Sequence, residues 1–298
     1  MKLTNSNSFL SCDWGTSSFR LRLVDTAAGT VFADVKTTRG IQAVYNSWSE
    51  TGKEQEREAF YYRYLEEQTA LLAEKVERDL DGIPVILSGM ASSGIGIKEL
   101  PYAPLPVSLE QPELQLDVRD ETTTFPHKVM LISGFCSDHD VMRGEETQLL
   151  GLASRYTIEN AMCILPGTHS KHVTIQSNKV VDFNTFLTGE LFNLLSTKSI
   201  LRNSLFSDTV FYEESFRRGI EQAQQKNLLT SLFNIRADEL LHHTDPAKNY
   251  YFLSGLLIGT ELAGLRQQPP GRIILAGEDP LQRFYDMALQ ILGLEYTP

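Results

Sequence analysis

The chain has 298 residues, of which 42% are hydrophobic and 22% charged, and its formal net charge is -11. This composition is ordinary for a globular protein of one or two domains, and the acidic balance argues against a nucleic-acid or anionic-membrane partner. No stretch approaches the length of a membrane span, and three distant cysteines (Cys12, Cys136 and Cys163) show no metal-binding spacing. We therefore expect a cytoplasmic protein with reduced thiols.

The chain opens with two predicted strands around a polar turn. The first strand is predicted over 9–12, which begins with the apolar Phe9 and Leu10. Apolar and polar residues alternate over 19–24, and 29–38 predict a third antiparallel strand. The first turn contains residues suited to binding phosphate and metal ions: Asp13, Gly15, Thr16, Ser17 and Ser18. Glycine admits a close phosphate, amides and hydroxyls donate to it, and an acid beside phosphate would hold Mg²⁺. A hydrophilic turn that satisfies its own backbone fits this motif equally well.

A helix rich in acids is predicted further along the first half. Residues 52–80 predict an earlier helix, and apolar runs at 83–89 and 128–134 predict strands that end on glycine. A second helix is then expected to begin near Asp138 or Asp140, with Glu145 and Glu146 in its first turns. Phosphoryl transfer needs a proton acceptor, and one of these acids could serve, although simple helix capping explains at least one of them. Arg143 could pair with a substrate carboxylate.

The second half repeats this organisation with different residues. Residues 161–186 again predict three strands joined by turns, and the first of these turns supplies phosphate donors and a cation: Gly167, Thr168, His169, Ser170 and Lys171. Helices are predicted over 188–201, 215–225, 228–241 and 249–265, followed by a strand, a glycine turn and a helix. Two matching turns make sense if both grip one polyphosphate. Neither turn is a P-loop, because its GxxxxGK[ST] pattern is absent.

These segments resemble a known family. "DWGTSSFRLRLVD", "LPGTHSKHV" and "IILAGEDPL" are similar to the phosphate-1, phosphate-2 and adenosine motifs of the sugar-kinase/actin/Hsp70 superfamily. "DVMRGEETQLLG", "FLTGELFNLL", "YFLSGLLIGTEL", "LSGMASSGIG" and "PYAPLP" resemble segments of the 2-dehydro-3-deoxygalactonokinase family, in order along nearly the whole chain. The resemblance implies an α/β protein of two ribonuclease-H-like lobes, with the actin-like ATPase fold and an interdomain nucleotide cleft. We place the N-terminal lobe at residues 1–145 and the C-terminal lobe at 146–298.

The resemblance also implies an activity and a set of site residues. The activity is ATP-dependent transfer of the γ-phosphoryl group to the 6-hydroxyl of 2-dehydro-3-deoxy-D-galactonate. Asp13 would hold Mg²⁺ and orient the attack, Gly277 would lie against adenine or ribose, and phosphate would bind Gly15, Thr16, Ser17, Ser18, Gly167, Thr168, His169 and Lys171. We rank Glu145 first as the catalytic base, with Glu146, Asp140 and Asp13 as alternatives. Candidates on the acceptor side are Arg143, Gly89, Met90, Ser92 and Tyr102.

Some features leave alternatives open. The acids Glu278 and Asp279 stand where the family commonly has small apolar residues, so the adenine contacts are uncertain. Because ATP and a sugar acid are both anionic, we expect a locally positive cleft built from Arg20 or Arg22, Arg143, Lys171 and Mg²⁺. A kinase or phosphatase of another carbohydrate and a non-catalytic actin-like regulator are the competing functions. The acceptor stereochemistry and the oligomeric state stay open, with a homodimer as one alternative.

Overall fold

A computed structural model describes residues 7–51, 57–267, 271–277 and 280–298 of the chain. The chain divides into two compact units, Met1–Tyr156 and Thr157–Pro298. The sequence predicted this boundary after residue 145, where helix α3 (Glu145–Ala153) begins, whereas in the structure this helix belongs to the first unit. Among the described residues, no helix combines the length and apolar character needed to cross a membrane.

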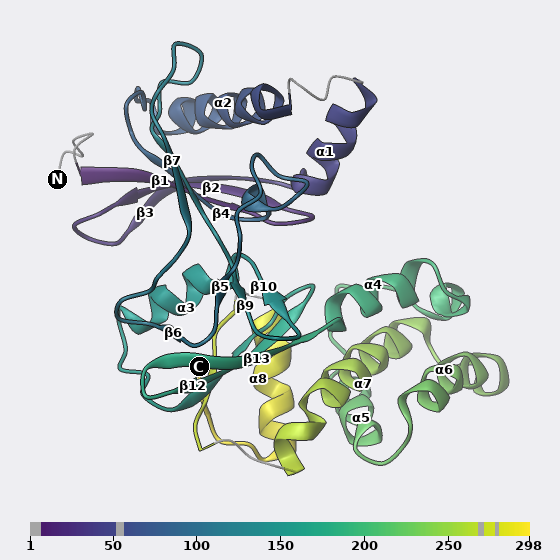
Figure 1. Cartoon of the computed structure of the whole chain (residues 1–298). Coiled ribbons are helices and arrows are strands. Elements are labelled where there is room, and N and C mark those ends of the chain that lie inside the picture. Colours follow the sequence, from purple (N-terminus) through teal and green to yellow (C-terminus); the bar gives the residue numbers. More distant parts are fainter. Residues whose placement is uncertain (1–6, 52–56, 268–270, 278–279) are drawn as a thin grey trace. The chain divides into compact units, whose positions relative to one another are not determined.

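The first unit is built on a mixed sheet with the strand order β3-β2-β1-β4-β8-β7 (Figure 1). The bounds are β1 (Ser8–Trp14), β2 (Phe19–Asp25), β3 (Val31–Thr37), β4 (Val85–Gly89), β7 (Leu116–Arg119) and β8 (Val129–Ile132). In β1 and β2 every second side chain is buried, which is the alternation that predicted these strands. Strand β2 runs antiparallel to β1, whereas β4 and β8 run parallel to it. The strands predicted for this half are confirmed.

Helices of the first unit cover this sheet and brace its first turn. Helix α1 (Ile41–Glu50) follows β3, and α2 (Arg57–Val76) lies across one face of the sheet (Figure 1). Helix α2 confirms the helix predicted over 52–80, although residues 52–56 lie outside the described residues. The Trp14 ring packs edge-on against Phe19 at 5.1 Å and lies 5.4 Å from the Tyr64 ring of α2. Such aromatic pairs contribute about 0.5–1.5 kcal/mol each beyond area burial, and here they fix both residues that flank the turn 15–18.

The segment before α3 differs from the prediction. A helix was expected from Asp138 or Asp140, but residues 135–142 form a short antiparallel pair, β9 (Phe135–Cys136) and β10 (Val141–Met142). Asp140 instead stabilises the connecting turn, because its carboxylate accepts a hydrogen bond from the Val141 amide at 2.7 Å. The remaining short elements of this unit are η3 (Met90–Ser92), β5 (Ala103–Pro104), which pairs with β9, and β6 (Val107–Ser108).

The second unit repeats the topology of the first. Its strands have the order β15-β14-β11-β12-β13, with β12 antiparallel to β11 and with β14 and β15 parallel to it. Their bounds are β11 (Ala161–Leu165), β12 (Ser170–Gln176), β13 (Lys179–Phe186), β14 (Ile273–Leu275) and β15 (Tyr296–Thr297). Read from its third strand, each unit therefore has the order three-two-one-four-five. This is the ribonuclease-H-like arrangement, and the predicted actin-like α/β fold is confirmed.

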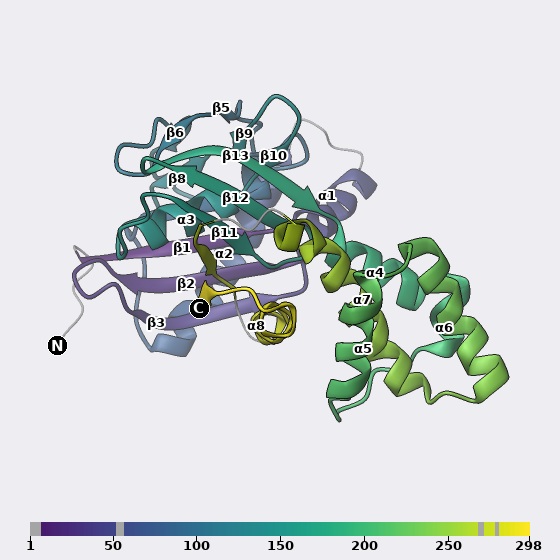
Figure 2. The same ribbon diagram turned by 90° about the horizontal axis from the view of Figure 1, so that it is seen from below.

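Helices of the second unit gather beside its sheet (Figure 2). They are α4 (Thr188–Thr197), η4 (Ile200–Ser204), α5 (Glu213–Ala223), α6 (Leu228–His242), α7 (Pro246–Gln267) and α8 (Leu281–Leu292), close to the predicted ranges. Helices α5 and α7 cross at very short range, because a Cβ on Gly255 would lie 2.0 Å from the Phe216 carbonyl oxygen. Helix α7 is thereby held firmly in this group of helices.

Candidate active site

The first phosphate turn is supported by the start of helix α1. The amides of Ile41 and Gln42 donate to the carbonyls of Gly15 (2.9 Å) and Thr16 (3.2 Å). A Cβ on Gly40 would lie 2.3 Å from the Thr16 oxygen, so only glycine fits at the head of this helix. The side chains of Thr16, Ser17 and Ser18 are exposed. The turn therefore has carbonyls that are bonded to α1 and hydroxyls that are accessible to an anion.

Asp13 lies where three segments of the first unit meet. It is half-buried at the end of β1, opposite Ser88 of β4 in the parallel register. A Cβ on Gly144 would lie 3.3 Å from the Gly89 Cα and 4.0 Å from Oδ1 of Asp13. Gly89 itself has a φ of +82°, and a Cβ there would approach the Trp14 carbonyl to 2.7 Å. Glycines at 89 and 144 thus let the end of β4 and the start of α3 approach the carboxylate of Asp13.

The two glutamates at the start of α3 have different environments. Glu145 is half-buried, and its Oε2 accepts a hydrogen bond from the Arg143 amide at 3.0 Å. Glu146 is fully buried, and its Oε2 accepts from the Gly144 amide at 2.6 Å. Burial, reinforced by the charge of Glu145, raises the pKa of Glu146 to about 8. At neutral pH, Glu146 therefore holds its proton.

Arg143 holds the loop that follows β4. Its guanidinium donates to the Ser92 hydroxyl at 2.6 Å, to the Ser92 carbonyl and to the Leu100 carbonyl at 3.2 Å. It also lies over the Tyr102 ring, 4.1 Å from the centroid. Among the described residues, its buried Nε–H has no hydrogen-bond partner. The structure therefore brings together the acceptor-side candidates Arg143, Ser92 and Tyr102, next to Gly89 and Met90 at the end of β4.

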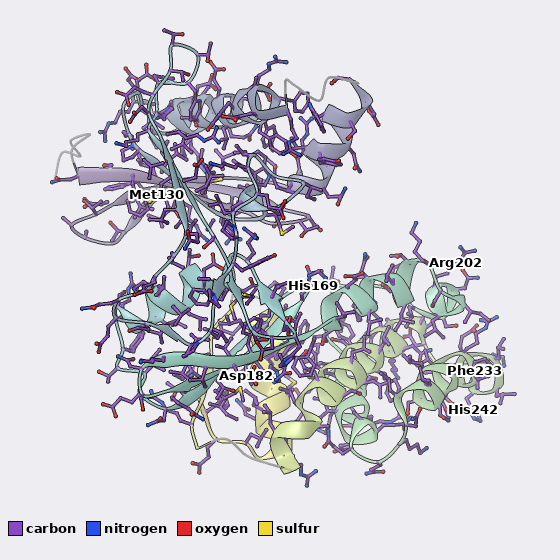
Figure 3. All side chains as sticks on the ribbon, viewed as in Figure 1. Met130, His169, Asp182, Arg202, Phe233 and His242 are labelled. Carbon is purple, nitrogen blue, oxygen red and sulfur yellow. The ribbon has the colours of Figure 1, made fainter. Side chains whose placement is uncertain are left out.

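The second phosphate turn has a support like that of the first. The Glu190 amide at the start of α4 donates to the Thr168 carbonyl at 3.0 Å. A Cβ on Gly189 would lie 2.7 Å from the Gly167 oxygen and 2.8 Å from the Thr168 Cα. His169, which is labelled in Figure 3, contacts the same helix, because its Nε2 lies 2.5 Å from Oε2 of Glu190. Gly40 and Gly189, which the sequence analysis missed, thus occupy equivalent positions in the two units.

Two residues of this turn are less accessible than the sequence suggested. Ser170 was counted among the phosphate donors, but it is fully buried and its hydroxyl lies 2.7 Å from that of Tyr285. Lys171 is only 4% exposed, and its ammonium group donates to the His169 carbonyl at 3.2 Å. Both residues belong to β12, whose burial pattern is almost continuous, so both are buried although they lie on opposite faces of the sheet. Thr168 is exposed and remains accessible.

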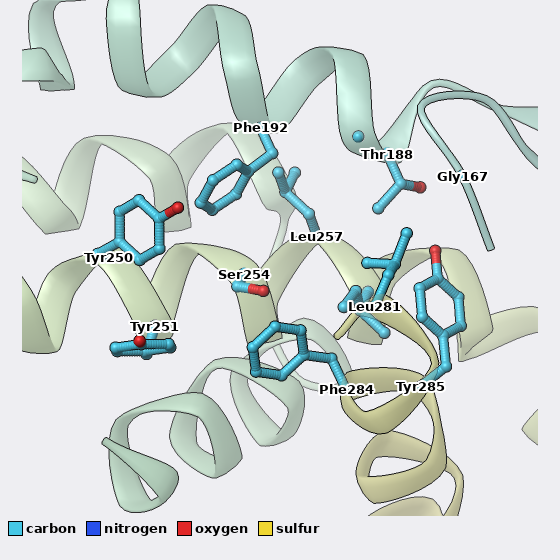
Figure 4. A pocket seen from close by; sticks show the side chains of 12 residues that line it. Gly167, Thr188, Phe192, Tyr250, Tyr251, Ser254, Leu257, Leu281, Phe284 and Tyr285 are labelled. Carbon is cyan, nitrogen blue, oxygen red and sulfur yellow. The ribbon is translucent and has the colours of Figure 1, made fainter. Parts of the chain in front are cut away.

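A cavity of about 200 Å³ adjoins the second turn (Figure 4). Gly167 and Thr188 lie at one end, and aromatic side chains form much of the wall: Phe192, Tyr250, Tyr251, Phe284 and Tyr285. The volume is below the roughly 300–1,000 Å³ of pockets for drug-sized ligands, so it suits one flat group of a larger ligand. Gly277 lies close to the residue before this turn, because a Cβ on Gly277 would lie 3.3 Å from Pro166 and 3.4 Å from Gln282. Glu278 and Asp279 lie outside the described residues.

The donor set suits a magnesium ion that is shared with phosphates rather than a protein-only metal centre. Among the described residues, no three His, Cys, Asp or Glu side chains gather in a metal-binding group. Mg²⁺ in phosphoryl-transfer sites commonly keeps several waters and takes only one or two carboxylates, with phosphate oxygens completing its shell. Asp13 can supply such a carboxylate beside the first phosphate turn.

Comparisons with known proteins agree with this geometry. A family model described as 2-keto-3-deoxy-galactonokinase matches residues 13–298. The chain belongs to this family. A probable 2-dehydro-3-deoxygalactonokinase of Rhizobium meliloti (strain 1021) is 30% identical, over 98% of this chain and 92% of its own length. The 2-dehydro-3-deoxygalactonokinase of Escherichia coli (strain K12) is 33% identical, over 72% of this chain and 73% of its own.

A solved structure extends the match to the fold. A crystal structure from Sinorhizobium meliloti that bears the 2-dehydro-3-deoxygalactonokinase name has a TM-score of 0.82 and 30% identity, covering 97% of this chain and 90% of that one. The resemblance stated from the motifs is therefore confirmed, and membership of the 2-keto-3-deoxy-galactonokinase family makes the chain an enzyme, a carbohydrate kinase.

Proposed function

We propose that the chain transfers the γ-phosphoryl group of ATP to the 6-hydroxyl of 2-dehydro-3-deoxy-D-galactonate. Membership of the 2-keto-3-deoxy-galactonokinase family supports the acceptor class. The observation that supports ATP as the phosphoryl donor is the pair of phosphate turns. Helix amides donate to two carbonyls of the first turn, Gly15 and Thr16, and to one carbonyl of the second, Thr168. A turn fixed in this way keeps amides and hydroxyls ready for phosphate oxygens, which is how phosphoryl-transfer enzymes position a nucleotide.

The phosphate-binding and metal-binding roles follow from accessibility. Exposed hydroxyls at Thr16, Ser17, Ser18 and Thr168 would donate to phosphate oxygens, and Gly15 and Gly167 would let those oxygens come close. Asp13 would hold Mg²⁺, which offsets phosphate charge during the transfer. His169 and Lys171 would act from the second turn, with Lys171 as a buried positive charge behind it.

We assign the catalytic base to Glu145 and a supporting role to Glu146. A base must be able to accept the proton of the attacking hydroxyl and must be within its reach, and the buried, protonated Glu146 meets neither condition. Glu145 is only half-buried at the same helix start. Glu146 fixes the Gly144 amide and thereby the approach of α3 to Asp13. Asp140 is the weakest alternative, because its carboxylate is bonded to its own turn.

The remaining groups of the two substrates have plausible partners within single units. The cavity beside Gly167 would take the adenine ring, which can stack against the aromatic side chains of its wall. Gly277 would lie near the ribose. In the first unit, Arg143 would attract the carboxylate of the sugar acid through the positive charge of its guanidinium, with Gly89, Met90 and Tyr102 around the acceptor.

The test is a coupled ADP-release assay with Mg²⁺-ATP, in which 2-dehydro-3-deoxygalactonate is compared with its gluconate epimer. We expect turnover that depends on the galactonate-type acceptor, loss of turnover in Asp13→Asn, and a fall in kcat of about 10²–10⁴-fold in Glu145→Gln. Arg143→Ala should raise the KM of the sugar acid more than that of ATP. Asp120→Asn removes an acid whose side chain is 86% exposed, and it should behave as the wild type.

Each alternative gives a different outcome in this assay. Full activity in Glu145→Gln together with loss in Asp13→Asn would move the base to Glu146 or Asp140. Turnover only with the gluconate epimer would identify a kinase of another sugar acid. Absence of acceptor-dependent turnover with either sugar acid would contradict the proposed reaction and favour a nucleotide-binding regulator.

A further inference from the structure

A buried carboxylate joins three elements of the second unit beside its phosphate turn. Glu261 of α7 is 5% exposed. Its Oε1 lies 2.9 Å from Nε2 of His172 on β12, and its Oε2 accepts hydrogen bonds from the hydroxyls of Tyr285 on α8, at 2.6 Å, and of Thr188 at the start of α4. A carboxylate removed from water is costly unless its oxygens are satisfied. Here both oxygens have partners, and each partner comes from a different element.

One branch of this network reaches the turn itself. The Tyr285 hydroxyl lies 2.7 Å from that of Ser170, and Ser170 Oγ in turn accepts from the Gly167 amide at 3.4 Å. Burial, together with the neighbouring Glu261, raises the pKa of Tyr285, so its phenol keeps its proton and donates to the carboxylate. Ser170 then donates to Tyr285 and accepts from Gly167. Because Oε2 of Glu261 accepts from Tyr285, the hydrogen bonds that lead from α7 to the turn all have a defined direction.

The other branch reaches the helix that supports the turn. Thr188 is the first residue of α4 and directly precedes Gly189, whose backbone packs against Gly167 and Thr168. The Glu190 amide donates to the Thr168 carbonyl. Figure 4 shows the Tyr285 hydroxyl on the side of Thr188 and Gly167. Glu261 thus contacts one residue that supports the turn through α4 and another that leads to it through Ser170.

A purely structural role is the simpler explanation of such a network. Buried charged groups are rarely retained for stability, however, because apolar side chains of similar volume often serve as well. Helix α7 already packs tightly against α5 through Gly255, so the carboxylate is not needed to place the helix. Its contacts converge instead on the two segments that shape the phosphate turn.

We propose that Glu261 is a positioning residue for nucleotide binding, which holds the turn 167–170 and the start of α4 in the arrangement that accepts phosphate. This inference rests on the proposed function, in which the turn binds the phosphates of ATP. Glu261, Tyr285 and Thr188 then support the turn together. Loss of any one of their side chains should weaken phosphate binding and leave binding of the sugar acid unchanged.

The test compares nucleotides with and without phosphates. Calorimetric affinities for ATP, ADP and adenosine are measured on the full-length wild type, Tyr285→Phe and Glu261→Gln, together with the KM of each substrate. Tyr285→Phe should weaken ATP and ADP about tenfold and leave adenosine within twofold, while kcat and the KM of the sugar acid change little. Glu261→Gln should do more, because its amide presents N–H groups to hydroxyl donors. Thr260→Val is the matched control, since the Thr260 hydroxyl bonds only within its own helix, to Leu256.

The outcomes separate the positioning role from its alternatives. An equal loss for ATP and adenosine, in a variant that unfolds at a lower temperature, would show a structural role and overturn the inference. Unchanged affinities in Tyr285→Phe, which keeps the ring and is the safer variant if Glu261→Gln does not fold, would overturn it as well. A wild type that binds adenosine and ATP equally would refute phosphate binding by the chain, and the inference would fall with the proposed function.

Discussion

Glu146 has an environment that makes a measurable difference to the stability of the chain. Its folded pKa of about 8 lies above its ordinary value of 4.5. Between these values the folded state holds a proton that the unfolded state has lost, so the free energy of unfolding falls as the pH rises. The contribution is complete below pH 4.5, declines by at most about 1.4 kcal/mol for each pH unit as the pH rises toward 8, and is lost once the pH has passed 8.

Glu146→Gln should remove this pH dependence. The amide is neutral at every pH and can still accept the hydrogen bond from the Gly144 amide. Urea unfolding between about pH 5 and pH 8 should give a flatter stability curve for the variant than for the wild type, with a relative gain of the order of a few kcal/mol toward pH 8. Glu145→Gln is the control. Because Glu145 is only half-buried, this variant should keep most of the pH dependence of the free energy of unfolding. Parallel curves for wild type and Glu146→Gln would show that Glu146 is ionised in the folded protein.

At the scale of elements, the phosphate turns depend on the glycines that begin the helices behind them. Gly40→Ala and Gly189→Ala would each push a Cβ into the backbone of a turn, and overpacking of this kind costs about 1–3 kcal/mol. We expect a lower free energy of unfolding and a raised KM for ATP in both variants. Gly264→Ala, on α7, meets nothing within 4 Å and should instead stabilise the chain by about 0.5–1 kcal/mol. A normal KM for ATP in Gly40→Ala and Gly189→Ala would contradict a role for these glycines.

The sequence predicted elements better than it predicted which side chains face a ligand. Alternation in residues 19–24 and the apolar run ending at Gly89 were sufficient for strands, because burial on one or both faces leaves a direct trace in the residue pattern. The start of α3 was missed because Asp140 caps a turn as readily as a helix. Ser170 was misjudged because a serine in a turn gives no sign of whether its hydroxyl points inward.

The support of the site was beyond sequence reasoning for a related physical reason. Gly40 and Gly189 act through close backbone contacts, and nothing in the residues around them distinguishes them from other glycines near the starts of helices. Glu261 meets Thr188, His172 and Tyr285 from positions far apart in the chain, so no local spacing could have predicted the network. The exact donors within the predicted turns, by contrast, followed from their chemistry and stay predictions.

At the scale of the whole molecule, stability should be unevenly distributed. Central strands such as β1, β4 and β11 bury most of their side chains, whereas α4 has no buried residue and α6 has only Ser231 and Ile235. The Phe233 side chain of α6 is 61% exposed (Figure 3). We expect hydrogen exchange to be slowest in the central strand of each sheet and fastest in α4 and α6, because local opening costs least where little is buried.

Hydrogen exchange followed by mass spectrometry would check this distribution. Repeating the measurement with bound ATP shows in addition which elements the nucleotide protects. Saturating ATP should slow exchange at the start of α4, where the Glu190 amide bonds to the Thr168 carbonyl, more than in α6. The outer helix α6 is therefore the internal control. Protection of α4 and α6 equal to that of β11 without ligand would contradict the expected distribution.

The way in which each turn is held has a consequence for how such chains diverge. Main-chain amides of a helix donate hydrogen bonds to main-chain carbonyls of the turn, and a glycine lets the two backbones come into contact. Side-chain substitutions within a turn leave these main-chain bonds intact, so turns held in this way can differ in sequence, as "DWGTSS" and "PGTHSK" do. In distant proteins of this fold, we expect the glycine at the start of the next helix to identify a phosphate turn more reliably than the residues of the turn itself.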